Sequence, residues 1–210
     1  RMYRLLDSER GRNTEARYNI APTQTVEFVT AGDDGSQKVR EGRWWLVPFW
    51  AKELPKAAMF NARIETVDTS GAFKHAWKDK RCLIPASGFY EWTKSSEDGG
   101  RDPWFIHLPE TAPFSFAGLW AYNQALDITS CTIITMPAGA AVRQLHDRQP
   151  VILDTGAYDD WLDPTTPTER LKPLLLDRNI DDDLRFYRVG REANGNKAQG
   201  PQLIEPLEDA

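Results

Sequence analysis

Short runs of alternating polar and apolar residues, each closed by a turn signal, constrain the fold of this chain most. Residues 25–30 (TVEFVT) alternate in this way, the turn signal GDDG follows at 32–35, and an extended pattern resumes over 37–45. Alternation with a period of two places one set of side chains on each face of a strand, and glycine and aspartate favour the turn between strands. The pattern predicts two strands joined by a turn.

The same arrangement recurs along the chain. We expect strands over 88–94 and 103–108 on either side of a polar, glycine-rich loop at 95–101, and two apolar strands over 114–122 and 131–135. Successive short strands joined by turns are typical of an antiparallel sheet that folds towards a barrel.

Helix signals are fewer, at 68–80, 158–162 and 168–176, the last with Pro167 suitably placed at its start. A chain of 210 residues, 40% of them hydrophobic, can bury a core of its own. We therefore expect one α+β domain over residues 1–210, with mostly antiparallel strands in a barrel-like sheet and a few flanking helices. The acidic end, 206–210, is expected to be a loose tail.

Composition excludes several classes of protein. No apolar run approaches the roughly 20 residues that cross a bilayer, and residues 1–10 are too charged for a signal peptide. We expect a soluble, intracellular, monomeric protein that contacts no membrane. Cys82 and Cys131 are the two cysteines, both in apolar strand-like runs, so we expect buried thiols and neither a disulfide framework nor a metal site.

Net charge and motifs limit the function further. The formal net charge is −5 and the sequence pI is about 5.3. Proteins that coat duplex DNA are normally basic, so a nucleic-acid partner would have to bind in a local groove. The sequence contains no phosphate-binding loop, dinucleotide fingerprint, zinc spacing or serine nucleophile elbow, and no cofactor is implied.

Four segments place polar residues among apolar ones, which is costly unless the polar residue has a partner or a task. They are 18–22 (YNIAP), 60–66 (FNARIET), 88–92 (GFYEW) and 145–150 (LHDRQP).

Glu91 lies between aromatic residues in a strand-like run, where a raised pKa would suit proton transfer. The alternative is a carboxylate on a solvated sheet face, paired with a lysine. His146 is a candidate for proton exchange near neutral pH, whereas a lone histidine is more often structural, as we expect for His75 and His107. Both interpretations of each residue stay open.

Asn61 and Arg63 are two residues apart and would face the same side of a strand. An amide can orient an amine, and a guanidinium can bind a phosphate through two parallel hydrogen bonds. The alternative for Arg63 is an ion pair with Glu65 within the sheet. Phe49 and Trp50, after a Pro48 break, belong either to the core or to an exposed platform on which a base stacks.

Taken together, in order and spacing, these segments resemble the SOS response-associated peptidase (SRAP) family of abasic-site processing proteins. The matching pieces cover nearly the whole chain: YNIAP at 18–22, FNARIET at 60–66, SGFYEW at 87–92, IITMPA at 133–138, LHDRQPVIL at 145–153 and GNKAQGPQLIEP at 195–206.

The resemblance implies a chemistry for the site. Family members begin, after loss of the initiator Met, with Cys-Gly-Arg; the α-amine and thiol of that Cys attack the aldehyde of a ring-opened abasic sugar, first as an imine and then as a thiazolidine. By the same resemblance Asn61 holds the α-amine, Glu91 shuttles protons and His146 helps to open the deoxyribose. The residues implied to contact DNA are Arg1, Asn19, Pro22, Phe49, Trp50, Arg63, Thr135 and Arg148.

Arg1 matches the arginine of Cys-Gly-Arg, so we expect Cys-Gly before it in the encoded protein; the alternative is a natural loss of the Cys. Neither Cys82 nor Cys131 could replace it, because an internal Cys has no free α-amine. The expected partner is single-stranded DNA with an abasic site, including sites at junctions with duplex. The protein is then expected in the cytoplasm with the nucleoid in a bacterium, or in the nucleus of a eukaryote. Two alternatives stay open: a cysteine peptidase that removes residues ahead of its own Cys, and a non-catalytic module for single-stranded or gapped DNA.

Overall fold

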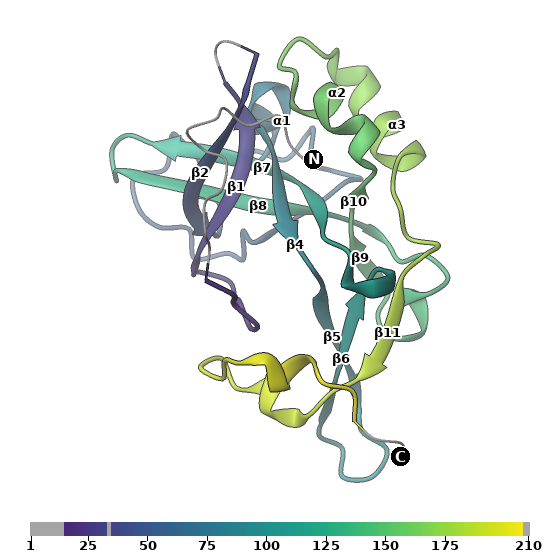
Figure 1. Ribbon diagram of the computed structural model, residues 1–210. Coiled ribbons are helices and arrows are strands. Elements are labelled where there is room, and N and C mark those ends of the chain that lie inside the picture. The colour runs from purple at the N-terminus through teal and green to yellow at the C-terminus, as the bar shows by residue number, and fades with distance from the viewer. Residues whose placement is uncertain (1–14, 33–34, 208–210) are drawn as a thin grey trace.

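The computed structural model describes residues 15–32 and 35–207 and shows one α+β domain dominated by strands (Figure 1). The strands are β1 Thr25–Ala31, β2 Gln37–Trp44, β3 Asn61–Arg63, β4 Arg81–Ala86, β5 Phe89–Lys94, β6 Arg101–His107, β7 Phe114–Asn123, β8 Ile128–Pro137, β9 Arg148–Pro150, β10 Ile152–Leu153 and β11 Arg185–Arg188. The helices are α1 Lys74–Asp79, α2 Tyr158–Leu162 and α3 Thr168–Asp177.

The larger sheet closes on itself. Its strands follow the order β10-β7-β4-β1-β2-β8-β3, with an additional β7–β8 pairing and with β9 paired to β8. The pairs β7–β4, β4–β1, β1–β2, β2–β8 and β8–β7 therefore form a ring. This confirms the barrel-like sheet; most pairs are antiparallel, while β2 and β3 run parallel to β8.

A second sheet of three strands, in the order β11-β6-β5, leaves β5 at its edge. The alternation expected for this segment is present, since Tyr90 lies beside Trp92, with ring centroids 6.2 Å apart, while Phe89 packs against Phe116 of the large sheet at 5.9 Å. Glu91 therefore belongs to the face opposite Trp92.

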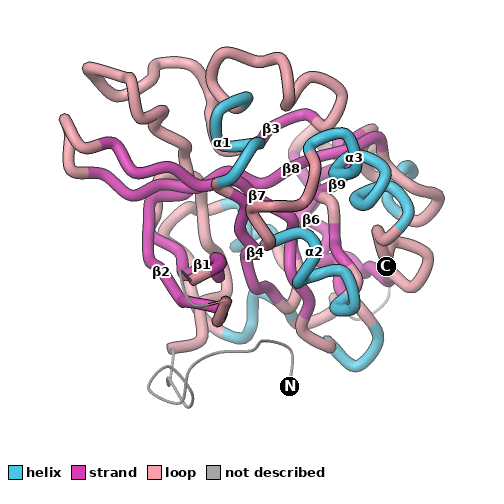
Figure 2. The backbone as a smooth tube through the Cα atoms, turned by 90° about the horizontal axis from the view of Figure 1, so that it is seen from above, coloured by secondary structure: helices cyan, strands magenta, loops and turns pink. Residues whose placement is uncertain are grey.

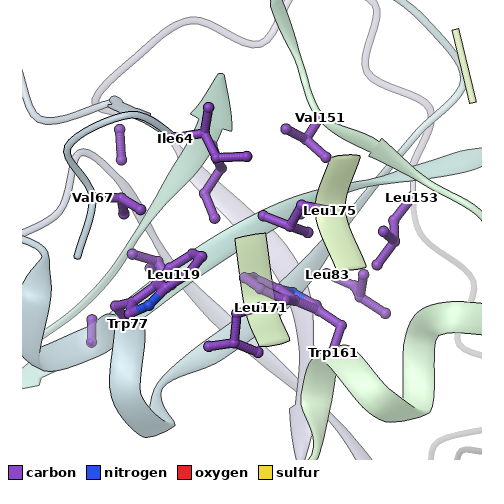
Figure 3. Close-up of a cluster of buried hydrophobic side chains, with 14 of the residues drawn as sticks. Ile64, Val67, Trp77, Leu83, Leu119, Val151, Leu153, Trp161, Leu171 and Leu175 are labelled. Atoms are coloured by element: carbon purple, nitrogen blue, oxygen red, sulfur yellow. The ribbon is translucent and has the colours of Figure 1, made fainter. Parts of the chain in front are cut away.

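The helices cover one side of the ring (Figure 2). Trp77 of α1 and Trp161 of α2 meet at 5.8 Å between ring centroids, and Leu171 and Leu175 of α3 complete the same buried cluster with Leu119 of β7 (Figure 3). Apolar burial of this extent is the main force that holds the helices on the sheet.

Both cysteines are free and fully buried, as expected. Burial raises the pKa of the Cys82 and Cys131 thiols, that of Cys131 to about 12. Since a thiolate is the reactive form, neither is an available nucleophile.

One expectation about element boundaries was wrong. The helix expected over 68–80 is shorter, because residues 66–73 form successive turns in which the Thr69 hydroxyl donates to the Thr66 carbonyl oxygen at 3.2 Å. Such side-chain bonds compete with helix formation. The tail expected to be loose from 206 is held at its start: Pro206 forms a β-bridge with Val189, and the Leu207 amide donates to the Arg188 carbonyl oxygen at 3.0 Å. Residues 208–210 lie outside the described residues.

Candidate functional site

Three distant parts of the chain meet at one cleft of about 1980 Å³. Asn61 of β3, Glu91 of β5 and His146 just before β9 all line it. Of the other predicted site residues, Asn19, Pro22, Arg63, Thr135 and Arg148 line it as well. The cleft lies between the large sheet and the edge strand β5, and the segment 15–22 runs along it.

Strand β3 presents Asn61 and Arg63 side by side. It runs parallel to β8, with Asn61 opposite Ile133 and Arg63 opposite Thr135. Both side chains are exposed, while Ala62 between them is buried. An amide and a guanidinium therefore point to the same side, as the spacing predicted.

Glu91 is half-buried and has an unusual environment. Burial raises the pKa of its carboxyl group; the nearby Asp147 carboxylate raises it further, and the charges of His146 and Arg101 oppose the rise. Among the described residues no lysine forms an ion pair with it. A carboxyl group that is easier to protonate than usual, beside an imidazole, can exchange protons with a bound molecule.

His146 is held through one ring nitrogen. Its Nδ1 lies 3.0 Å from both the amide nitrogen and the carbonyl oxygen of Arg148, and 3.4 Å from a carboxylate oxygen of Asp147. Nε2 makes no hydrogen bond to a described residue. The side chain is 42% exposed, so Nε2 is the ring nitrogen that can reach a ligand.

Arg148 is engaged with protein groups at both of its terminal nitrogens. Nη1 donates to Glu65 Oε1 at 2.5 Å, and Nη2 donates to Glu65 Oε2 at 3.0 Å and to the Thr135 carbonyl oxygen at 2.9 Å. The Arg148 hydrogen bond holds the pKa of the Glu65 carboxyl below its usual value. The alternative of an Arg63–Glu65 ion pair was wrong: Glu65 binds Arg148, while the charge of Arg63 acts on it only from further away.

Asn19 is buried and its side chain binds the C-terminal segment. Its Nδ2 donates to the carbonyl oxygens of Ala193 and Gly195, at 3.4 and 3.0 Å. The Gln199 side chain donates from Nε2 to the main-chain carbonyl oxygen of Asn19 at 2.9 Å. Tyr90 adds a hydrogen bond from its hydroxyl to the carbonyl oxygen of Tyr18 at 2.7 Å. These contacts fix the segment that leads into the cleft.

Phe49 and Trp50 are not core residues. They are 56% and 54% exposed, and Phe49 rests edge-on against His75 with ring centroids 5.3 Å apart. They are not among the residues that line the cleft. Arg1 lies outside the described residues.

The sequence pattern did not single out Arg101, which lines the cleft, or Glu65, which pairs with the cleft residue Arg148. Glu65 lies within the FNARIET segment and was considered there only as a partner for Arg63. Arg101 packs its guanidinium over the Trp92 ring at 5.1 Å from the centroid, and both line the cleft. The signal available in the sequence was Arg101 itself, a charged residue on the strand that pairs with β5, where it can reach the Trp92 ring.

Neither a cluster of metal ligands nor a membrane-spanning helix is found among the described residues. No group of three or more His, Cys, Asp or Glu side chains in this part of the chain could hold a metal ion. None of its helices has the length and apolar character needed to cross a membrane.

The family model of the SOS response associated peptidase (SRAP) matches residues 2–196. The chain belongs to the SRAP family. It is 37% identical to the abasic site processing protein YoaM of Bacillus subtilis, over 90% of this chain and 84% of YoaM. It is also 26% identical to the abasic site processing protein YedK of Escherichia coli, over 91% of this chain and 85% of YedK.

A solved structure has the same fold as this chain. A crystal structure of a Bordetella bronchiseptica protein superposes with a TM-score of 0.73 and 29% identity, covering 90% of this chain and 98% of that protein. The α+β barrel-like fold expected from the sequence is therefore that of a known protein.

Proposed function

We propose that this SRAP protein, in a form with Cys-Gly before Arg1, captures abasic sites in single-stranded DNA as a covalent thiazolidine. The observation that carries the proposal is the meeting of Asn61, Glu91 and His146 in one cleft, from β3, β5 and the segment just before β9. The names of YoaM and YedK, both abasic site processing proteins, support the choice of substrate.

The chemistry requires an aldehyde, which an abasic deoxyribose exposes when its ring opens. His146, with Nε2 directed away from its own protein contacts, is suited to move a proton at the ring oxygen. A missing base also leaves less stacking to disrupt when the sugar turns into a cleft.

Imine formation follows at the α-amine. Asn61 Oδ1 can accept a hydrogen bond from that amine and direct its lone pair at the aldehyde carbon. The C–N bond forms and one amine proton moves to the aldehyde oxygen, which becomes a hydroxyl. Glu91, whose raised pKa favours its protonated form, donates a proton to this hydroxyl, and as water leaves it takes back the remaining proton from the nitrogen to give the imine. The thiol sulfur then adds to the imine carbon, and its proton passes to the nitrogen, with Glu91 as carrier.

Binding of the strand is assigned to charges and rings around the cleft. Arg63, exposed on β3, is suited to grip a phosphate, and the exposed Phe49 and Trp50 surface is suited to stack a base of the same strand. This local arrangement suits a protein whose net charge is −5. We propose a monomer that acts where DNA is held, in the cytoplasm of a bacterium or the nucleus of a eukaryote.

The test uses the chain with Met-Cys-Gly before Arg1, expressed so that the initiator Met is removed. It is incubated with a single-stranded oligonucleotide in which a glycosylase has converted one uracil to an abasic site. We expect a band that survives denaturing electrophoresis, with a mass one water below the sum of protein and DNA. The matched controls are Ser in place of the added Cys, and oligonucleotide without uracil, neither of which should give the band.

Two outcomes would support other functions. A denaturant-sensitive complex without any covalent band, even with the Cys in place, indicates a binding module. Release of a segment placed ahead of the Cys, without reaction with DNA, indicates a self-processing peptidase.

A further inference from the structure

Glu65 and Arg148 form an ion pair that spans strand β8. At Thr135, β8 is flanked by Arg63 of β3 on one side and by Pro150 of β9 on the other. Arg148, which begins β9, reaches across Thr135 to Glu65, which follows β3, and the contact is bidentate. We call this pair, with its bond to Thr135, the β8 clasp.

Thr135 is the centre of the clasp. Its carbonyl oxygen accepts from the Ile64 amide at 2.9 Å and from Arg148 Nη2 at 2.9 Å, and its hydroxyl oxygen lies 3.2 Å from the same Nη2. One oxygen thus joins the end of β3, which carries Asn61, to the start of β9. The strands β3, β8 and β9 lie together in Figure 2.

The main chain of Arg148 connects the β8 clasp to His146. Hydrogen bonds from Val151 N to the Ile134 oxygen and from Ala138 N to the Asp147 oxygen, at 2.8 and 2.9 Å, define the hydrogen-bonded pairs of this ladder. The pair of Pro137 with Arg148 falls between them and is therefore a non-hydrogen-bonded pair. The amide and carbonyl of Arg148 consequently point away from β8, where both lie 3.0 Å from His146 Nδ1.

We propose that Glu65 is a positioning residue, which acts through Arg148 to hold the His146 imidazole with Nε2 towards the cleft. The clasp also occupies the guanidinium of Arg148, so that Arg63 is left as the cation of this wall that meets a phosphate. For its effect on reaction rate, the inference rests on the proposed function.

A purely stabilising ion pair is a weaker explanation. The side chains of Glu65 and Arg148 are 45% and 21% exposed, and pairs with this much solvent contribute little to folding. A carboxylate beside a DNA-binding surface also repels phosphate. The position of Glu65 is better explained by its role in holding Arg148 and, through Arg148, His146.

The test compares Glu65→Gln with Glu65→Asp and with Glu169→Gln, an exposed substitution on α3 away from the cleft. Ring-nitrogen NMR signals of His146 report its tautomer and orientation. We expect them to shift towards a mixture of tautomers in Glu65→Gln, to shift less in Glu65→Asp and to stay unchanged in Glu169→Gln.

Binding of intact single-stranded DNA gives a second measurement that needs no lesion. Release of Arg148 in Glu65→Gln should tighten binding at low salt and steepen the plot of log affinity against log salt by ~0.7, the value for one added phosphate contact on a single strand. Covalent capture of an abasic site should nevertheless slow about tenfold, because the imidazole loses its alignment.

Unchanged His146 signals in Glu65→Gln, or weaker DNA binding by this variant, would overturn the inference. If the unmodified protein forms no crosslink, the proposed function fails, while the NMR and salt measurements still decide the role of Glu65.

Discussion

Arg81→Met is expected to destabilise the protein strongly without touching the cleft. Arg81 is 2% exposed, and its guanidinium donates to carbonyl oxygens of Trp161 at 2.6 Å, Trp77 at 3.1 Å and Lys78 at 2.5 Å, and to that of Asp163. These carbonyls end α1 and α2, where no helical partner exists. One buried cation therefore caps two helices.

The magnitude follows from which carbonyls lose their partner. The bonds to Trp161 and Trp77 are buried, whereas those to Lys78 and Asp163 are only partly so, and water can replace them. A buried polar group left unsatisfied costs about 1–3 kcal/mol. Methionine keeps most of the aliphatic packing, and burial already disfavours the charged guanidinium, whose pKa is lowered. We expect a loss of about 4 kcal/mol in the free energy of unfolding.

Urea unfolding, followed by tryptophan fluorescence, measures the loss. With a slope of about 2 kcal/mol per molar urea, the midpoint should fall by about 2 M. The matched control is Arg40→Met on β2, where the partly buried guanidinium stacks over Trp120 at 4.5 Å and donates from Nε to the Thr30 hydroxyl at 3.1 Å; its midpoint should fall by no more than about 0.5 M. A fall as small as this for Arg81→Met would refute the capping role.

Three further predictions concern the cleft and the thiols. Glu91→Gln should slow crosslinking about a hundredfold. Because burial raises the pKa of Glu91, the ionised carboxylate destabilises the folded protein at pH values above the raised pKa. The variant should therefore resist urea better than the unmodified protein at neutral pH, and it should lose this advantage below the ordinary pKa of 4.5. Equal urea midpoints at neutral pH would contradict this. Trp50→Ala should weaken single-stranded DNA binding by about 1–3 kcal/mol in fluorescence anisotropy with an unchanged unfolding midpoint, and unaltered affinity would exclude the stacking role. Cys82 and Cys131 should react with a disulfide reagent only after unfolding, and titration of either thiol in the native protein would show that it is accessible.

Local periodicity predicted the long strands and missed the short ones. The alternation over 25–30 and the apolar run over 114–122 anticipate β1 and β7, because each segment is long enough for its pattern to be visible. Strands of two to four residues, such as β10 and β11, carry no such pattern. The parallel pairing of β2 with β8, which closes the ring, joins segments nearly 90 residues apart and leaves no mark in either one.

The motif resemblance selected residues that line one cleft, but it did not predict which groups they contact. The motif resemblance selected Asn61, Glu91 and His146, and the structure brings them to one cleft. It could not indicate that Asn19, in the YNIAP segment, is buried against the C-terminal segment. Which backbone carbonyl a buried amide meets depends on tertiary packing, and no local rule encodes it.

The pairing of Glu65 with Arg148 and not with Arg63 shows how tertiary structure decides such contacts. On continuous extended backbone Arg63 would be its same-face neighbour, but β3 ends at Arg63 and the chain turns, so the carboxylate leaves that face. Arg148, 83 residues further along, meets it with two parallel bonds and adds a third to Thr135. A bidentate pair with a partly buried guanidinium is stronger than a distant charge in water. The partner taken by this one carboxylate decides which arginine stays free of it, and so where β3 stops determines that Arg63 is exposed while Arg148 is paired.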